Sequence, residues 1–294
     1  MPAATASRVL PQPEWRAREA AHAARVDAWT AGHRERARER RPHPVEGFLF
    51  TYYSHRPNQL RRWHPGHGTA LAGAAERTGW RWYADVGGGA VGVDVDAFLA
   101  ERRDSVLFVR DLLLATASRP AHLGCFGLHE WAMVYRRPPE QVRHARWPLR
   151  LGPDGTDAVV ERHRVRCSHF DAYRFFTPDA APLNTLRPSR SAQVDLEQPG
   201  CLHATMDLYK WSYKLSPAVP SELVGDCFEL AREVRVLDMR ASPYDLSALG
   251  HEPVRIETPE GKAEYVEAQR AFAERAAVLR RRLLAVCDAL LAEE

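Results

Sequence analysis

The chain has 294 residues, of which 45% are hydrophobic and 27% charged, and its formal net charge is +3. This composition supplies enough apolar surface for a packed core and excludes an intrinsically disordered chain. The small positive charge excludes a protein that coats nucleic acid by charge alone, although it permits DNA or another anion as a partner.

The number and spacing of the cysteines and the hydropathy pattern indicate in which cellular compartment the protein is expected. There are five cysteines, an odd number, and no two of them form a Cys-x-x-Cys motif. Neither a disulfide framework nor a cysteine zinc site is therefore indicated. No stretch resembles a signal peptide, and no apolar run approaches the roughly 18 residues that cross a membrane. We expect a cytoplasmic protein with no membrane segment.

The N-terminal part of the chain is predicted to be helical with one hairpin. Residues 1–12 are predicted as a disordered tail, because nothing there is apolar enough to offset the entropy of ordering it. Residues 14–41, rich in Ala, Arg and Glu, predict a long helix. Two short aromatic and β-branched runs flank three glycines within 80–93, which is typical of a hairpin. A helix capped by Asp94 or Asp96 is expected next.

The C-terminal part is predicted to contain short strands and then long helices. A glycine-punctuated helix is expected over 124–136. Short apolar runs between turn residues, followed by a proline-rich connector, predict a short-strand and proline-rich insertion over 145–200. Helical patterns cover 223–239 and 260–292. The predicted fold is mainly α with a small β insertion (α+β), in a single globular and mostly helical domain over 13–294.

Residues 201–215 combine an imidazole, a carboxylate, three large aromatic rings and two lysines. Pro-Gly precedes this stretch and Ser-Pro follows it, so we predict one short, delimited helix. In a helix, His203 and Asp207 stand on one face at i and i+4. A half-buried structural helix would account for the aromatic residues equally well.

Two further stretches repeat the combination of imidazole, carboxylate and aromatic ring. One contains His129, and the other contains His169. Three such stretches would seldom arise by chance, so we expect them to form a shared site. If they converge, they provide nitrogen and oxygen ligands for a mononuclear or dinuclear metal site. The predicted ligands are His129, Glu130, His169, Asp171, His203 and Asp207.

The same residues also suit the removal of a damaged base. Aromatic faces can hold an extruded, electron-poor base, and a carboxylate can stabilise oxocarbenium character or activate water. The candidate catalytic residues are Asp171, Asp207 and Glu130. The candidate substrate-binding residues are Trp211, Tyr173, Tyr209, Trp131, His203, His169 and Arg174.

Five segments together carry a resemblance to a known family, namely residues 48–54, 60–66, 127–136, 166–178 and 198–217. They resemble a bacterial family whose members carry the name 3-methyladenine DNA glycosylase. The resemblance covers most of the chain from Pro42 to the last predicted helix. It implies base-excision DNA repair by hydrolysis of the N-glycosidic bond of alkylated purines, with DNA as partner and no cofactor.

Three functions are therefore left open by the sequence. A DNA glycosylase predicts a hydrolase that needs no metal and binds DNA in a salt-sensitive way. A metal-dependent enzyme predicts a bound divalent ion and a polar pocket for a small molecule. A non-catalytic binding protein predicts neither the glycosylase activity nor the metal-dependent activity. Elemental analysis of the purified protein separates the first two.

Overall fold

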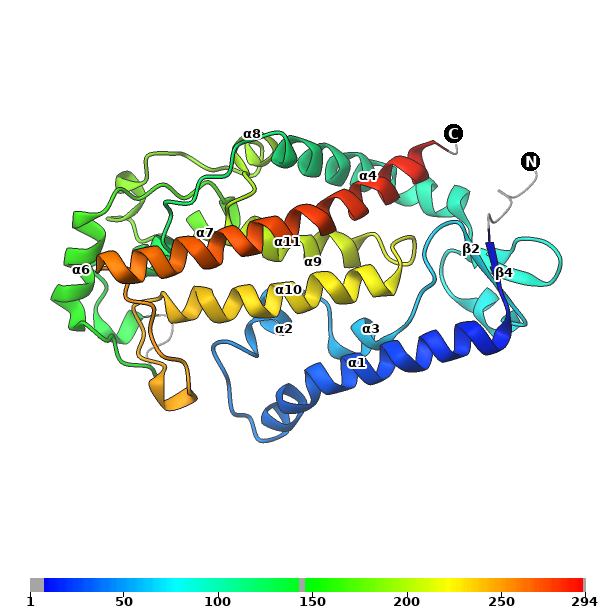
Figure 1. Cartoon of the computed structure of the whole chain (residues 1–294), viewed down its shortest axis with the longest axis horizontal. Helices are drawn as coiled ribbons and strands as arrows, with labels where there is room; N and C mark the ends of the chain where they lie inside the picture. The colour runs from blue at the N-terminus through cyan, green and yellow to red at the C-terminus, as the bar shows by residue number, and fades with distance from the viewer. Residues whose placement is uncertain (1–7, 143–145, 293–294) are drawn as a thin grey trace. The chain divides into compact units, whose positions relative to one another are not determined.

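The computed structural model describes residues 8–142 and 146–292, whose helices and strands are shown in Figure 1. Contacts between residues divide the chain into two compact units. Unit 1 consists of Met1–Leu113, Leu208–Glu229 and Val278–Glu294, and unit 2 of Leu114–Asp207 and Leu230–Ala277. The single domain expected from the sequence stays a prediction.

The predicted fold class is confirmed. Helices make up 58% of the chain, and the described residues contain one small sheet of four strands. Within the described ranges, no helix is both long and apolar enough to cross a membrane.

Unit 1 contains the sheet and the first long helices (Figure 1). In chain order its elements are β1 (Arg8–Leu10), α1 (Gln12–Arg38), α2 (Phe48–Tyr52), α3 (Pro57–Arg61), β2 (Thr69–Ala72), the 3₁₀ helix η1 (Ala75–Gly79), β3 (Tyr83–Asp85), β4 (Ala90–Val93) and α4 (Val95–Ala117), whose last residues belong to unit 2. The sheet order is β1-β2-β4-β3, with β1 parallel to β2 and the other pairs antiparallel. The predicted hairpin is β3 and β4, and Asp94 caps α4 by accepting a hydrogen bond from Ala97 N–H at 2.9 Å.

The predicted disordered tail is wrong for residues 8–12. Leu10 lies opposite Leu71 in the parallel pair of β1 and β2, and its side chain is 0% exposed. A strand of three residues carries too little periodicity to be recognised, and its partner lies about sixty residues further along the chain. Residues 1–7, the remainder of the predicted tail, lie outside the described residues.

A buried arginine joins α1 to the loops around the sheet. Arg77 is 1% exposed, and its guanidinium carbon lies 4.9 Å from the ring centre of Trp15, 5.4 Å from that of Trp63 and 4.6 Å from that of Trp80. Its charge is balanced by Glu19 of α1 at 2.5 Å. A buried cation without a carboxylate would be very costly, so this pair and its aromatic walls hold the region together.

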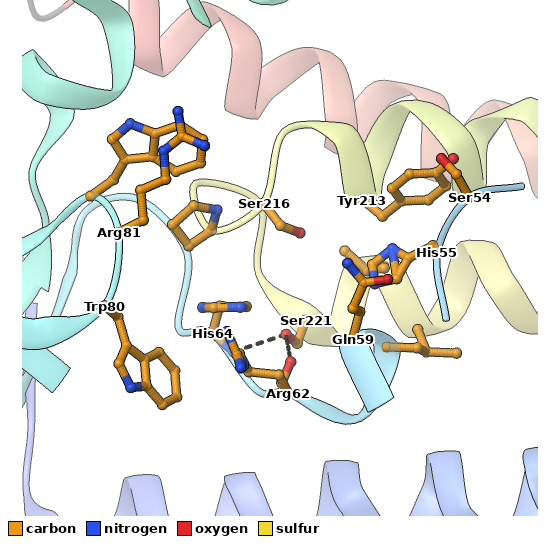
Figure 2. Close-up of a pocket in the computed structure, with 14 residues that line it drawn as sticks. Ser54, His55, Gln59, Arg62, His64, Trp80, Arg81, Tyr213, Ser216 and Ser221 are labelled. Atoms are coloured by element: carbon orange, nitrogen blue, oxygen red, sulfur yellow. Dashed lines mark hydrogen bonds between the residues drawn. The ribbon is translucent and has the colours of Figure 1, made fainter. Parts of the chain in front are cut away.

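The loop after α3 is held against the start of α10 (Ser221–Arg240). Ser221 Oγ accepts a hydrogen bond from His64 N–H at 2.9 Å and donates one to the Arg62 carbonyl at 3.3 Å (Figure 2). Gly66 has a φ of 87°, and a Cβ built on it would lie 2.5 Å from Cγ of Pro220. Only glycine permits both this backbone conformation and this close approach.

Unit 2 is made of short helices and parts of the long ones (Figure 1). Its short elements are α5 (Leu128–Ala132), η2 (Pro139–Gln141), α6 (Gly152–Arg162), α7 (Phe170–Tyr173), η3 (Ala181–Leu183), α8 (Gln193–Leu196) and η4 (Ser247–Leu249). The boundary between the units falls within the long helices α9 (Leu202–Lys214), α10 and α11 (Pro259–Leu291). These three helices confirm the helical segments predicted over 201–215, 223–239 and 260–292.

Two predictions for unit 2 are wrong. The predicted short-strand insertion over 145–200 contains no strand among its described residues, apart from an isolated bridge between Leu149 and Tyr244. The apolar run 158–160 belongs to α6, because Pro153 in the first turn starts a helix and a run of three residues fits either structure, whereas the run 149–151 directly precedes this helix. The helix predicted over 124–136 is reduced to the five residues of α5.

Candidate functional site

Four of the six predicted ligands converge in unit 2. His129 lies on α5, His169 directly precedes α7, and His203 and Asp207 lie on α9. All four side chains are buried. Two carboxylates that the sequence did not single out complete the group. They are Glu197, which follows α8, and Asp238 on α10.

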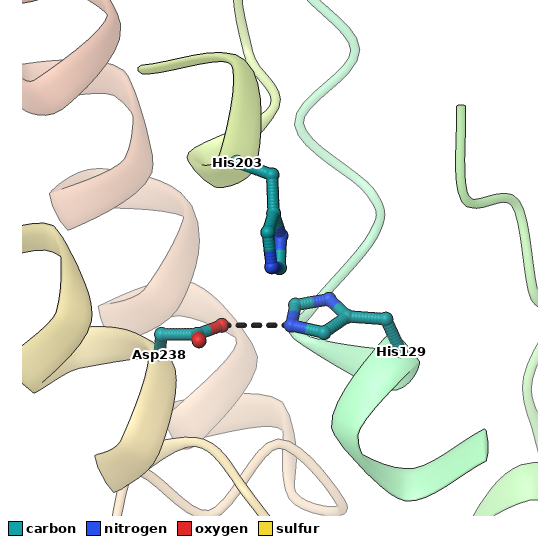
Figure 3. Close-up of side chains that lie close together, drawn as sticks. All are labelled: His129, His203 and Asp238. Carbon is teal, nitrogen blue, oxygen red and sulfur yellow. Dashed lines mark ion pairs between the residues drawn. The ribbon is translucent and has the colours of Figure 1, made fainter. Parts of the chain in front are cut away.

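The first triad consists of His129, His203 and Asp238 (Figure 3). Nε2 of His129 lies 2.9 Å from Oδ1 of Asp238. The imidazole ring of His203 stands nearly perpendicular to that of His129, with 4.4 Å between ring centres. In Figure 3 both imidazoles and the carboxylate point toward one common space.

The second triad consists of His169, Glu197 and Asp207. Nε2 of His169 lies 3.1 Å from Oδ2 of Asp207 and 3.4 Å from Oε1 of Glu197. Gln193 donates a hydrogen bond to the same oxygen of Glu197 at 2.6 Å, which fixes this carboxylate. One imidazole is thus placed between two buried carboxylates.

The two triads adjoin through His203. Its ring stacks on that of His169 with 5.2 Å between ring centres, while its edge contact with His129 belongs to the first triad. We call these six residues the imidazole–carboxylate cluster. Every one of its members belongs to unit 2.

The position of His129 depends on how α5 is anchored. Gly127 before the helix has a φ of 66°, a conformation that L side chains rarely adopt. Trp131 is fully buried and donates from its indole nitrogen to the carbonyl of Ala241 at 2.8 Å. The backbone turn and the tryptophan together fix the face of α5 that carries the imidazole.

Arg235 supplies the positive charge next to the first triad. Its Nη1 lies 2.8 Å from Glu130 and 2.5 Å from the second oxygen of Asp238. Burial by itself raises the pKa of Asp238, but the adjacent imidazole of His129 and the guanidinium of Arg235 hold that pKa well below its usual range. Asp238 is therefore a carboxylate near neutral pH, and Glu130 pairs with Arg235.

His203 is a neutral imidazole. Burial, and then the neighbouring His129, lower the pKa of His203 well below the usual value for histidine. A neutral imidazole is the form that binds a metal ion. The ionised Asp238 and the neutral His203 thus have the protonation states of metal ligands.

A small cavity of about 20 Å³ reaches the first triad. His129, His203 and three cysteines, Cys125, Cys167 and Cys201, are among its lining residues. Burial raises the pKa of the Cys167 thiol to about 12, so this sulfur is a neutral thiol rather than a thiolate. A volume above roughly 10–15 Å³ is enough for one water molecule.

A larger cavity of about 320 Å³ in the same unit shares three lining residues with the small one. The shared residues are Arg166, Ser168 and Gln198. Arg166 is exposed, and its guanidinium lies 3.2 Å from Nδ1 of His122, which also lines the larger cavity. The shared residues therefore connect the larger cavity with the surroundings of His129 and His203.

The remaining predicted site residues lie elsewhere. Asp171 is on α7, 3.2 Å from the guanidinium of Arg174, and is not a member of either triad. Tyr173 on the same helix packs on Phe176 with 5.1 Å between ring centres. The convergence predicted for all six ligands is thus wrong for Asp171, and Glu130 is placed beside the cluster rather than in it.

The predicted stacking residues on α5 and α9 are packed against other side chains. Trp131 and Tyr209 are both 0% exposed. Trp211 is 8% exposed and contacts Phe108 within unit 1, with 5.5 Å between ring centres. Such positions suit core packing, because a base can stack only on a face that it can reach.

Glu197 and Asp238 were missed for different reasons. Glu197 lies in the proline-rich connector, where no periodicity indicates which side chains point inward. Asp238 stands three residues after Arg235 on a predicted helix, a spacing that also describes an ordinary solvated ion pair. For Asp238 a signal was nevertheless present, because the apolar residues Leu237 and Met239 flank it.

Comparison of the chain with protein-family models, with curated proteins and with solved structures finds no match in any of the three. Membership of the 3-methyladenine DNA glycosylase family stays a prediction. Function is therefore inferred from the chemistry and geometry of the site.

Proposed function

We propose that this protein is a metal-dependent enzyme whose imidazole–carboxylate cluster binds one or two divalent cations and acts on a small molecule. The observation that carries the proposal is the spacing of the donor atoms. In each triad, one nitrogen or oxygen atom per residue lies within 4.8 Å of the others. Ligands at about 2.1 Å from an ion stand roughly 3 to 4.3 Å apart, so a small closure around an ion satisfies either triad.

The charge of the region supports a cation. Four buried carboxylates, Glu130, Glu197, Asp207 and Asp238, are grouped with one guanidinium, that of Arg235. Buried carboxylates are stable only when they are paired, hydrogen-bonded or bound to a metal. A divalent cation between the imidazoles and carboxylates of either triad is such a partner.

The chemistry follows from the donor set and the cavity. Imidazole and carboxylate ligands suit zinc, iron, manganese or cobalt, and such an ion, when bound, would activate water for hydrolysis near neutral pH. The cavity of about 20 Å³ beside His129 and His203 has room for that water. Asp238 orients the ring of His129, and the larger cavity at Arg166 and Ser168 accepts a small polar or anionic substrate.

The decisive experiment measures metal in the full chain. Elemental analysis of the protein as purified, followed by calorimetric titration of chelator-treated protein with Zn²⁺, Mn²⁺ and Fe²⁺, should detect at least one stoichiometric ion. His203→Gln should weaken binding at least about tenfold, since it removes a ligand of the first triad and the ring that stacks on His169 of the second. His163→Gln, at the end of α6 in the same unit, is the control and should leave affinity unchanged.

A purely structural network is the competing interpretation. Histidine–carboxylate pairs and Arg235 can stabilise a core without any ion. That interpretation is supported if the wild-type protein holds no metal and takes up none on titration. Equal loss of affinity in the His203 and His163 variants would also contradict the proposed site.

DNA glycosylase activity is a second candidate function, and α7 favours it. Asp171 and Tyr173 on this helix are only partly buried, and Arg174 directly after it is exposed, whereas the carboxylates and imidazoles of the cluster are buried. We expect Asp171→Asn to abolish release of 3-methyladenine from alkylated DNA while DNA affinity is retained, because an amide cannot act as a base. Release measured by chromatography in the presence of chelator tests this, and absence of release from the wild type rules it out.

A further inference from the structure

Unit 1 contains a cavity of about 470 Å³ between the loop after α3, the segment before β3 and the turn that follows α9 (Figure 2). This volume lies within the range of sites for small organic ligands. None of the 14 described residues that line it is acidic, and Arg62 and Arg81 are among them. We call it the Trp–Arg pocket. It does not depend on the function proposed above, whose residues all belong to unit 2.

The wall of the Trp–Arg pocket contains a buried histidine whose ring nitrogens are both without a hydrogen-bond partner among the described residues. This residue, His55, is 7% exposed. The centre of its ring lies 4.4 Å from the ring centre of Tyr213 and 5.9 Å from the ring centre of Tyr209. Burial lowers the pKa of His55 to about 4, so the ring is neutral near pH 7 and offers one donor and one acceptor. Buried polar groups are nearly always hydrogen-bonded, so a partner is expected from a ligand or from water.

The mouth of the pocket carries positive charge and flat aromatic surface. Arg62 is exposed, its guanidinium carbon lies 5.0 Å from the ring centre of Trp80, and no carboxylate pairs with it among the described residues. The guanidinium carbon of Arg81 lies 4.1 Å from the ring centre of Trp82, and this arginine pairs with Glu101, which does not line the pocket. Arg62 is thus the cation available to a bound anion, and both indole rings are only partly buried.

The backbone beside the pocket is strained at one of these tryptophans. Trp82 has a φ of 60°, in the left-handed region that bulky residues rarely adopt. Such conformations persist only where the surroundings impose them, and they are frequent at ligand sites. Here the strained residue is one of those that line the pocket.

We infer that the Trp–Arg pocket binds a small organic anion with a planar ring, of the chemistry of a mononucleotide. The ring stacks on an indole face, the anionic group pairs with Arg62, and His55 hydrogen-bonds a polar group of the ligand. Aromatic stacking and a charge-assisted hydrogen bond together provide affinity without any further contact.

The test is calorimetric titration of the full chain with adenosine 5′-monophosphate (AMP) as the probe. We expect saturable binding with a dissociation constant below about 1 mM. Adenosine, which lacks the anion, and inorganic phosphate, which lacks the ring, should each bind at least about tenfold more weakly. No saturation by AMP in this range, or equal binding of AMP and inorganic phosphate, would overturn the inference.

Two variants and one matched control assign the residues. Arg62→Gln should weaken AMP binding about tenfold or more, whereas Arg61→Gln should not, since this neighbouring arginine pairs with Asp27 and does not line the pocket. His55→Phe keeps the ring shape against the two tyrosines. It should weaken AMP binding several-fold while the melting temperature stays the same or rises. Equal effects of the two arginine variants, or a His55→Phe protein of wild-type affinity, would contradict the assignment.

Discussion

At the scale of single residues, both candidate sites rest on histidines that burial keeps neutral. In unit 2 this neutrality gives His203 the protonation state that the proposed metal site requires, and in unit 1 it leaves His55 with an uncharged ring in the Trp–Arg pocket. The physical cause is the same, because a charged imidazole loses its hydration when it is buried. The consequence is a dependence of stability on pH.

We predict that His55 destabilises the fold in mild acid. Its pKa is about 4 in the folded protein and near 6.5 when unfolded, so the unfolded chain binds more protons between these values. Stability therefore falls as the pH drops from about 6.5 to about 4, by roughly 2 to 3 kcal/mol from this residue. Urea unfolding at pH 7 and pH 4.5 should show a smaller loss in His55→Phe than in the wild type. Parallel losses in the two proteins would show that the folded pKa of His55 is not lowered.

Gly66 provides a second residue-scale prediction. Gly66→Ala should lower the free energy of unfolding by more than about 2 kcal/mol. The alanine would have to adopt a φ of 87°, and its Cβ would lie 2.5 Å from Cγ of Pro220. Gly88→Ala is the control, since its φ is 64° and nothing lies within 4 Å of the added Cβ. It should cost about 1 kcal/mol from backbone strain alone. Equal costs by chemical denaturation would mean that the loop moves freely away from Pro220.

At the scale of elements, short segments matter as much as the long helices. Strand β1 has three residues, yet it completes the sheet and buries Leu10. Helix α5 has five, yet its anchored turn positions His129. Such elements have little intrinsic stability and form because their side chains are buried against the rest of their unit.

Strand β1 is tested by two neighbouring substitutions. Leu10→Ala should lower the free energy of unfolding by roughly 2 to 5 kcal/mol, as for other buried leucines. Val9→Ala, in the same strand but 52% exposed, should change it by less than about 0.5 kcal/mol. If Leu10→Ala also had no effect on the melting temperature, residues 8–12 would belong to a disordered tail after all.

At the scale of the whole molecule, each unit has its own candidate site. The cluster belongs to unit 2 and the Trp–Arg pocket to unit 1. We predict that hydrogen exchange detected by mass spectrometry will distinguish them, since a ligand protects the amides whose opening it opposes. A divalent metal should slow exchange in residues 128–132 and 202–207, and AMP in residues 54–64 and 80–82. If the metal does not protect its region, the metal-site proposal is contradicted. If AMP does not protect its region, the proposal for the Trp–Arg pocket is contradicted.

Local periodicity and helix-end residues in the sequence predict the mainly helical fold, the hairpin and the long helices with their caps. The sequence also indicated His129, His169, His203 and Asp207, since each of their stretches combines an imidazole with a carboxylate and aromatic rings. The folded structure is needed to see that β1 pairs with a distant strand and that Glu197 and Asp238, rather than Asp171, join the histidines. These choices depend on contacts between segments far apart in the chain, where burial selects which charged side chains point inward, and no local pattern encodes that selection.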